Sequence, residues 1–333
     1  MPVTPSADES LSAGYHDEWY FTGLAWLRSL DCRSRVLSLR GHDNNASTEQ
    51  HSNAVQKLKI LLLATMEEDK EKFQILSDLH LESPAAYDNF QIIPRAPYLC
   101  LLGDIGYVND DGFYTFLRSQ LEAFRAVFLV FGNHEPYHSS WVEAKQKLES
   151  FKNEIEASTG QALGKFVILY QTRYDISSDI TILECTLFSK IFKEQIENVN
   201  FGLNDFYHID NWTVDDHQKA HMSDLAWLNE QLASISASKP DRTVIVLTHY
   251  SPTTNEKTID PRHATSRISS GFMTDLTSEP CWQNAAVKVW AFGHTHFNCD
   301  YEDVEHWKRA ISNQRGYYFA QAEGFDIEKV VEV

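Results

Sequence analysis

The sequence lacks an apolar run long enough to cross a lipid bilayer. A membrane-spanning helix needs about 20 apolar residues, and the longest candidate, Ile60–Met66, is far shorter. The first residues also lack a basic segment that leads into an apolar one, so we expect no secretory signal peptide. Together these absences favour a cytoplasmic protein that has no membrane partner.

Cysteine is scarce and scattered along the chain. The five cysteines are an odd number without any C-x-x-C pair, and they stand at positions 32, 100, 185, 281 and 299. This spacing argues against a disulfide framework and against a metal site built from thiolates. We therefore expect reduced thiols, as is typical of an intracellular protein.

Positive charge is also limited. The 333 residues include 29 Lys and Arg against 47 Asp and Glu, which gives a formal net charge of −18. No cluster of basic residues interrupts this excess, so electrostatic repulsion disfavours a long nucleic acid as a partner. A small phosphate ester that is attracted by bound cations fits the composition better.

Residues 1–70 differ from the rest of the chain. They contain Ser-, Asp- and Asn-rich stretches and lack the alternation of strand and helix patterns that follows. We predict an irregular N-terminal extension, either disordered or an accessory segment packed around Trp19 and Trp26. A second interpretation is that residues 1–65 are a gene-model artefact and that Met66 is the true start.

Residues 71–333 alternate between strand and helix patterns, which predicts an α/β domain. Ser140 and Glu143 form a capping box that predicts a helix to about residue 155. A second helix follows Thr213, with an apolar stripe through Met222, Leu225, Leu228, Leu232 and Ile235. Eight short runs have the Val-, Ile-, Leu- and Phe-rich character of buried strands: residues 73–77, 98–102, 126–131, 166–170, 180–185, 243–248, 287–292 and 316–320.

Five short motifs follow predicted strands directly. They are D-x-H at Asp78 and His80, G-D at Asp104, G-N-H-E at residues 132–135, a single His249, and G-H-x-H at His294 and His296. Loops outside the carboxyl ends of strands are where open α/β sheets bind ligands. One isolated histidine after a strand is more often structural than a ligand, but the ordered set of five motifs has no comparable structural explanation.

The residue types in these motifs suit a metal centre. Carboxylate oxygens and neutral imidazoles bind Mn, Fe and Zn, and Asp104 is the natural carboxylate to bridge two ions. Alternate residues of an extended segment point the same way, so Asp78 can share a site with His80, and His294 with His296. The motifs also contain glycines that permit tight turns and close backbone approach, at positions 103, 132 and 293.

The motifs resemble those of the calcineurin-like metallophosphoesterase superfamily over roughly residues 72–320. The resemblance implies a four-layer α/β/β/α sandwich with a dinuclear metal centre between its sheets. Metal one would take Asp78, His80, Asp104 and His296. Metal two would take Asp104, Asn133, His249 and His294. The segments 181–188, 201–206 and 312–317 further resemble a fungal branch of the superfamily.

The resemblance also implies a mechanism. Two metal ions, drawn from Mn, Fe and Zn, would hold a bridging hydroxide for in-line attack on phosphorus. His134 would be the general acid that protonates the leaving oxygen, and Asp104 and Asn133 would complete the catalytic set. Glu135 and Asp205 would be hydrogen-bond partners of the ligand imidazoles.

Four residues near the motifs carry open interpretations. Arg315 either clamps a phosphate oxygen or forms a salt bridge that closes the sandwich, whereas Tyr137 and His138 are candidates to line the substrate pocket. Tyr107 completes a G-D-x-x-Y pattern that resembles purple acid phosphatases, whose tyrosine binds ferric iron. Those enzymes lack a histidine at the position of His80, so we interpret Tyr107 as an ordinary loop residue.

The motifs thus predict a hydrolase of small phosphate esters, such as nucleotides or cyclic nucleotides. They leave open the choice between monoesters and diesters, and the oligomeric state. One alternative is a metallo-nuclease of the same superfamily, which the acidic charge disfavours; another is a non-catalytic scaffold, which the intact ligand set disfavours. A calcineurin-type protein phosphatase is disfavoured because Pro136 stands where that group extends its signature with basic residues.

Overall fold

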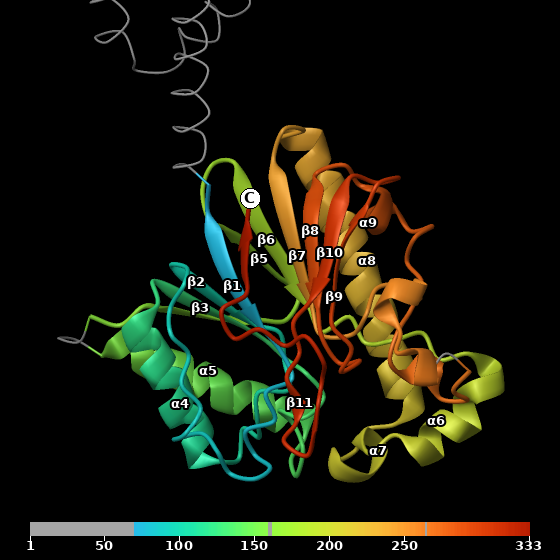
Figure 1. The fold of residues 1–333 in the computed structure, drawn as a ribbon, viewed down its shortest axis with the longest axis horizontal. Helices are drawn as coiled ribbons and strands as arrows, with labels where there is room; N and C mark the ends of the chain where they lie inside the picture. The colour runs from blue at the N-terminus through green and yellow to red at the C-terminus, as the bar shows by residue number, and fades with distance from the viewer. Residues whose placement is uncertain (1–69, 159–161, 264) are drawn as a thin grey trace, which may run out of the picture. The chain divides into compact units, whose positions relative to one another are not determined.

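The computed structural model describes residues 70–158, 162–263 and 265–333, which are the coloured ribbon of Figure 1. Lys70–Val333 form one compact unit. The expected N-terminal extension, with Trp19, Trp26 and Met66, lies outside the described residues. Among the helices of the described residues, none combines the length and apolarity that a bilayer crossing requires.

The first sheet is almost entirely parallel. Strands β1 to β4 run in the same direction and pair in chain order, and β13 adds an antiparallel edge beside β1. In spatial order the strands are β13 (Val330–Glu332), β1 (Lys72–Leu76), β2 (Tyr98–Leu101), β3 (Ala126–Val130) and β4 (Lys165–Leu169). The carboxyl ends of β1, β2 and β3 therefore open at the same edge, where three of the five motifs lie.

The second sheet has four parallel strands between antiparallel edges. Strands β6, β7, β8 and β10 are parallel, whereas β5 and β9 pair antiparallel with β6 and β10. In spatial order the strands are β5 (Thr172–Asp175), β6 (Ile180–Cys185), β7 (Thr243–Thr248), β8 (Val287–Phe292), β10 (Lys308–Ser312) and β9 (Cys299–Asp303). The carboxyl ends of β7 and β8 carry the remaining two motifs.

The two sheets pack face to face, and helices cover their outer faces (Figure 1). Side chains alternate along the strands: on β3, Phe128 enters the core between the sheets and Leu129 enters the core beneath the helices. Helices α4 (Asp111–Ala123) and α5 (Trp141–Ala157) cover the first sheet, and α8 (Val214–Ser238) and α9 (Pro280–Gln283) cover the second. The expected four-layer α/β/β/α sandwich is confirmed.

Seven of the eight predicted strands are present within one residue of their expected bounds. The prediction of a core strand at residues 316–320 was wrong, because these residues form a hairpin of β11 (Gly316–Tyr317) and β12 (Ala320–Gln321). The core strand in this region is β10, which the sequence conceals because it begins with Lys308 and Arg309. Lys308 is nevertheless buried, and its ammonium donates to the carbonyl oxygen of Trp282.

Helix α8 buries polar as well as apolar side chains. Its second half carries the expected apolar face, with Leu228, Leu232 and Ile235 buried. Its first half buries His217, His221 and Asp224, while Met222, which we expected on this face, is 60% exposed. An α-helix has 3.6 residues per turn, so the buried face that contains Leu228 continues through positions 224 and 221. Met222 lies beside this face. The two histidines of this helix therefore lie inside the protein.

Two long connections, which we call the first and second insertions, follow β6 and β7 and lie beyond the strand ends of the second sheet (Figure 1). The first insertion, residues 193–208, contains a 3₁₀ turn at Lys193–Gln195, helix α6 (Ile196–Gly202) and helix α7 (Asp205–His208). The second insertion, residues 256–273, contains 3₁₀ turns at Glu256–Thr258, Pro261–His263 and Ser269–Gly271. The insertions pack through a separate apolar cluster whose buried members are Ile191, Val199, Leu203 and Val214, with Ile268 and Phe272 against them.

His217 predicts that acid destabilises the fold. Burial lowers the pKa of His217 to about 3, while the unfolded chain takes up a proton near pH 6.5. The contribution of neutral His217 is therefore present above about pH 6.5 and is lost progressively toward about pH 3. Across that range the free energy of unfolding should fall by up to about 1.4 kcal/mol per pH unit.

Urea titrations between about pH 7 and pH 5 would measure this slope. His217→Gln, which cannot titrate, should flatten it, whereas the same substitution at the exposed His263 should keep the slope of the unmodified protein. Equal slopes in the two variants would contradict the prediction.

Candidate metal centre

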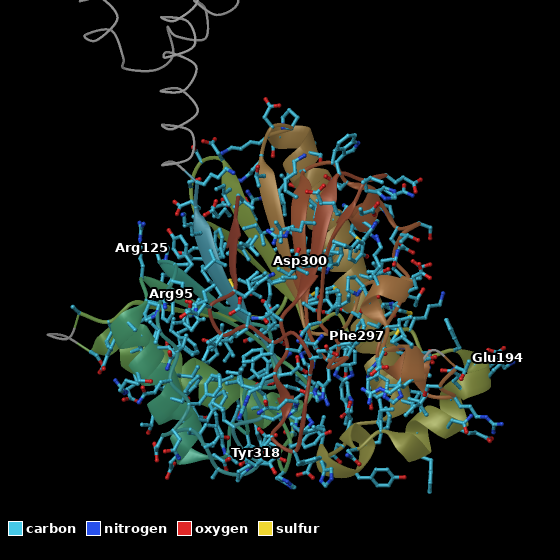
Figure 2. All side chains as sticks on the ribbon, viewed as in Figure 1. Arg95, Arg125, Glu194, Phe297, Asp300 and Tyr318 are labelled. Atoms are coloured by element: carbon cyan, nitrogen blue, oxygen red, sulfur yellow. The ribbon has the colours of Figure 1, made fainter. Side chains whose placement is uncertain are left out.

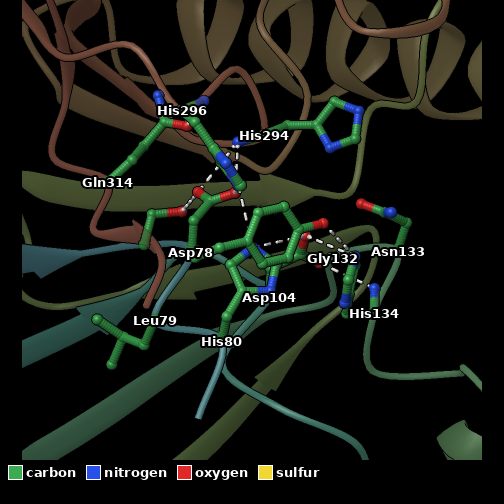
Figure 3. Close-up of polar contacts among 12 residues, drawn as sticks. Asp78, Leu79, His80, Asp104, Gly132, Asn133, His134, His294, His296 and Gln314 are labelled. Atoms are coloured by element: carbon green, nitrogen blue, oxygen red, sulfur yellow. Dashed lines mark hydrogen bonds and ion pairs between the residues drawn. The ribbon is translucent and has the colours of Figure 1, made fainter. Parts of the chain in front are cut away.

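The five motifs converge at the carboxyl ends of strands from both sheets. The loops after β1, β2 and β3 bring Asp78, His80, Asp104 and Asn133, and the loops after β7 and β8 bring His249, His294 and His296. Figure 3 shows Asp78, His80, Asp104 and His296 close together, with Asn133, His134 and His294 beside them. The structure thus gathers all seven candidate ligands in one place.

The first donor group consists of Asp78, His80 and His296, whose ligand atoms lie within 4.8 Å of one another. The Nε2 atoms of the two histidines are 3.0 Å apart, and Asp78 Oδ1 lies 3.3 Å from His296 Nε2. Asp78 Oδ2 accepts the Ser77 hydroxyl at 2.5 Å and the His294 backbone N–H at 3.0 Å. These bonds fix the direction of the Asp78 carboxylate.

The second donor group consists of Asp104, His249 and His294, again within 4.8 Å, with Asn133 beside it. His249 Nε2 lies 3.1 Å from His294 Nδ1 and 3.0 Å from Asn133 Oδ1. The carbonyl oxygen of Leu102 accepts from His249 Nδ1 at 2.8 Å. Because Nδ1 is held in this way, His249 presents Nε2 to the group.

Asp104 lies between the two donor groups. Its Oδ1 is 3.5 Å from His249 Nε2, and its Oδ2 is 3.8 Å from His80 Nε2. One carboxylate therefore turns one oxygen toward each group, as a ligand shared by two ions must do.

The protonation states of these residues fit metal ions. Burial raises the pKa of Asp104 well above its usual range, so a nearby cation is needed to keep the carboxylate ionised. Burial also lowers the pKa values of His249 and His294, which keeps both imidazoles in the neutral form that binds metals. His294 Nε2 is buried and has no hydrogen-bond partner among the described residues. Oxygen and imidazole donors of this kind suit Mn, Fe or Zn.

Left-handed backbone conformations mark the ligand loops. Five candidate ligands have φ angles between 46° and 70°, namely Asp78, His80, Asp104, His294 and His296. Each such conformation costs a non-glycine residue roughly 1–3 kcal/mol, and such residues concentrate at functional sites. The ligand loops thus give up stability to point their side chains into the centre.

Two glycines make the close approach of these loops possible. A Cβ atom on Gly132 would lie 2.2 Å from Asp104 Oδ1, and one on Gly103 would lie 2.6 Å from His249 Nδ1. Gly103 also has a φ of +87°, which favours glycine. The close backbone approach expected from the sequence is confirmed at both positions.

Glu82 joins the centre although the motifs do not include it. Its Oε1 lies 3.0 Å from His80 Nδ1 and 3.1 Å from His134 Nδ1, and its side chain is 1% exposed. By holding both Nδ1 atoms, Glu82 directs the Nε2 atoms of His80 and His134 toward the centre. The alternation Asp78-x-His80-x-Glu82 is the sequence signal that could have found it.

His134 lies beside the donor groups without belonging to them. Its Nε2 is 3.9 Å from Asp104 Oδ2 and 3.3 Å from the Tyr317 hydroxyl. Burial alone would lower its pKa, but the negative charges of Asp104 and Glu82 raise the pKa of His134 to about 9. The neighbouring carboxylates thus favour the protonated ring, which is the form that can donate a proton.

Glu135 holds backbone groups rather than an imidazole, which corrects the expected role. Its buried carboxylate accepts the N–H groups of Asp104 at 3.0 Å, Ile105 at 2.8 Å and Gly132 at 2.7 Å. Glu135 thus joins the loops after β2 and β3, on which Asp104 and Asn133 stand.

Asp205 also holds groups other than an imidazole. Its Oδ1 accepts the Asn133 amide at 2.8 Å and the Tyr137 hydroxyl at 2.7 Å, and its Oδ2 accepts the Tyr250 hydroxyl at 3.3 Å. Because the amide of Asn133 donates to Asp205, its Oδ1 is left facing His249. Asp205 begins α7, so it connects the first insertion to the centre.

A cavity of about 350 Å³ opens beside the donor groups. Asp104, Asn133, His134, His294 and His296 line it, together with residues of both insertions and Tyr137. Tyr317 lines it as well, with its ring centroid 4.2 Å from that of His80. The sequence does not single out Tyr317, because the pattern of residues 316–320 predicts a core strand.

Arg315 and His138, two of the suggested substrate residues, do not line this cavity, whereas Tyr137 does. Arg315 Nη1 donates to the Leu79 carbonyl oxygen at 2.8 Å, and its guanidinium lies 5.0 Å from the ring centroid of Phe90. These contacts match neither the phosphate clamp nor the salt bridge. His138 lines a separate groove between α4 and α5.

Tyr107 packs its ring near His134 and His138, with centroids 6.2 Å and 5.3 Å away. Burial raises the pKa of Tyr107 to about 12, which disfavours tyrosinate. His80 stands in the first donor group, as the sequence interpretation required. We keep the interpretation of Tyr107 as an ordinary loop residue.

Glu135→Gln should destabilise the protein by about 1–3 kcal/mol, because an amide cannot accept all three backbone N–H groups. Urea unfolding of chelator-treated protein would measure the loss separately from metal binding. The same substitution at the exposed Glu230 on α8 is the control and should change the stability little. A loss no larger than that of Glu230→Gln would refute the role of Glu135.

Residues 72–298 match the calcineurin-like phosphoesterase family. The uncharacterized protein L509 of Acanthamoeba polyphaga mimivirus is 26% identical over 265 residues, which cover 73% of this chain and 90% of L509. The phosphopantetheinyl hydrolase PptH from Mycobacterium tuberculosis has a similar fold, with a TM-score of 0.58 at 16% identity over 79% of this chain and 96% of PptH. A dimetal phosphatase from Danio rerio aligns with a TM-score of 0.45 at 14% identity over 73% of this chain and 86% of its own. With more than half of its length matched, the chain belongs to the calcineurin-like phosphoesterase family.

Proposed function

We propose that this protein hydrolyses small phosphate esters at a dinuclear metal centre. The position of Asp104, whose two oxygens face two separate donor groups, carries the proposal. Two bound cations would supply the activated water and the charge neutralisation that in-line attack on phosphorus requires. The volume of the adjacent cavity, about 350 Å³, supports a small substrate.

The ligands divide between the two groups, and Asp104 belongs to both. One ion would be held by Asp78, His80, Asp104 and His296. The other would be held by Asp104, Asn133, His249 and His294. These side chains come from both sheets, so each ion would be anchored to the whole sandwich.

We assign proton donation to His134. It lines the cavity, Glu82 holds its Nδ1, and its Nε2 faces the space beside Asp104. A phosphate seated at the donor groups would place its leaving oxygen within reach of that nitrogen. Asn133, which Asp205 orients, can contact the same phosphate.

His134→Ala should keep its metal ions and lose turnover on alkyl esters by about 10²–10⁴-fold, because their leaving oxygen needs a proton. The loss should be smaller for p-nitrophenyl phosphate, whose leaving group departs without one. Metal analysis and kcat on both substrates would measure this. His138→Ala, outside the cavity, is the control and should resemble the unmodified protein. Unchanged turnover of alkyl esters in His134→Ala would show that the acid assignment is wrong.

Asp104→Asn should reduce the metal content below two ions per chain and abolish turnover, because it removes the shared carboxylate charge. Chelation of the unmodified protein should also abolish turnover, and Mn, Fe or Zn should restore it. Elemental analysis alongside the assay would test both points, with Asp215→Asn on the exposed side of α8 as control. Full metal loading without turnover would favour a non-catalytic scaffold, and faster cleavage of DNA than of small esters would favour a nuclease.

A further inference from the structure

The cavity beside the metal centre combines a polar part with an apolar part. The candidate ligands and His134 form the polar part. The two insertions form the apolar part through Leu203, Ile259, Ile268, Phe272 and Met273. Phe272 stacks on the candidate ligand His294, with ring centroids 5.0 Å apart and planes inclined by 26°. The apolar part therefore begins directly at the donor groups.

The apolar part is preformed. Leu203 is buried in the separate cluster that joins the insertions, and Ile268 and Phe272 pack against the same cluster. The packing is tight: a Cβ atom on Gly202 would lie 3.2 Å from the Ile268 side chain. A substrate would meet an apolar surface that does not have to be assembled at the moment of binding.

The described residues that line this cavity include no lysine or arginine. Asp205 and Asp260, in contrast, both line it. Arg262, whose Nε donates to Asp260 Oδ2 at 2.8 Å, is exposed and engaged by that carboxylate. A second phosphate or a carboxylate that lay against the two insertions would therefore find no lysine or arginine to pair with, and Asp205 nearby.

Exposed aromatic side chains adjoin the lining residues. Phe201, next to Gly202, is 82% exposed, and Phe319, which stacks on Tyr317 with ring centroids 5.5 Å apart, is 79% exposed. Tyr318, labelled at the lower edge of Figure 2, is exposed on the same β11–β12 hairpin. Organic groups that extend past the cavity would thus meet further apolar surface.

We propose that the substrate is a phosphate ester with a single anionic group and an apolar, uncharged organic part, which lies against Phe272, Ile268 and Leu203. The inference rests on the proposed function, because the metal centre would set the position of the phosphate. It narrows the expected substrates by excluding nucleoside di- and triphosphates. Each CH₂ group buried in the cavity should raise kcat/KM about fourfold.

A series of linear alkyl phosphates tests the inference with the metal-loaded protein. Ethyl, butyl and hexyl phosphate have leaving groups of similar basicity, so differences in kcat/KM report binding of the chain. We expect a rise of about fourfold per CH₂ until the cavity is filled. The matched ester with a terminal carboxylate in place of the terminal methyl of hexyl phosphate should react at least about tenfold more slowly. Equal rates along the series, or no penalty for the carboxylate, would overturn the inference.

Ile268→Lys places a cation in the apolar part and should shrink or reverse the preference for hexyl phosphate over its carboxylate analogue. Ile93→Lys is the matched control, because Ile93 is 58% exposed and does not line the cavity. It should keep the preference of the unmodified protein. An unchanged preference in a folded Ile268→Lys would place the organic group elsewhere.

Failure of the inference differs from failure of the proposed function. If the metal-loaded protein hydrolyses p-nitrophenyl phosphate but its kcat/KM does not depend on alkyl length, the proposed function stands and the inference about the substrate is wrong. If nothing is hydrolysed, calorimetry with ethyl- and hexylphosphonate still decides, since tighter binding of the longer chain would support the apolar subsite and equal affinities would overturn it.

Discussion

Asp104 brings a carboxylate into a region that water barely reaches, and most of the local structure follows from holding that charge. Its two oxygens face two donor groups, and each group takes ligands from both sheets. The loop that carries it is bonded through Glu135 to the loop that carries Asn133. Burying a carboxylate costs free energy unless cations compensate its charge. The left-handed backbone of the ligand loops and the glycines at positions 103 and 132 are therefore consistent with a metal centre.

The sandwich and its loops have separate tasks. The central strands of each sheet are buried on both faces, whereas the edge strands β5 and β9 are partly exposed. One core lies between the sheets and one lies beneath the helices on each side. The ligand loops depart from favourable backbone geometry because the sandwich fixes both of their ends. Asp205 extends this order to the first insertion, since it links α7 to Asn133 at the centre. The position of the apolar part of the cavity therefore depends on the position of the ligands.

The distribution of charge gives the cavity its character. The chain has a formal net charge of −18, and the described residues that line the cavity include no lysine or arginine. Bound cations would then be the main attraction for a phosphate, and the acids around the cavity would repel a second anionic group. The excess of acidic residues that disfavours a long nucleic acid therefore also disfavours small esters with a second anionic group.

The sequence by itself determined seven strands of the two sheets and the seven candidate ligands, because both depend on local pattern. Apolar runs predict buried strands, and a polar motif that directly follows such a run is expected at the end of a strand. Tertiary structure alone decided the partners of His134, which lies beside those ligands. Glu82 reaches His134 across 52 residues, and Tyr317 reaches it across 183, so no local pattern can show either contact. Strand β10 could not be predicted for a similar reason. Lys308 is a charged residue in the sequence, and its ammonium can be buried because folding brings the carbonyl oxygen of Trp282 close enough to accept a hydrogen bond from it.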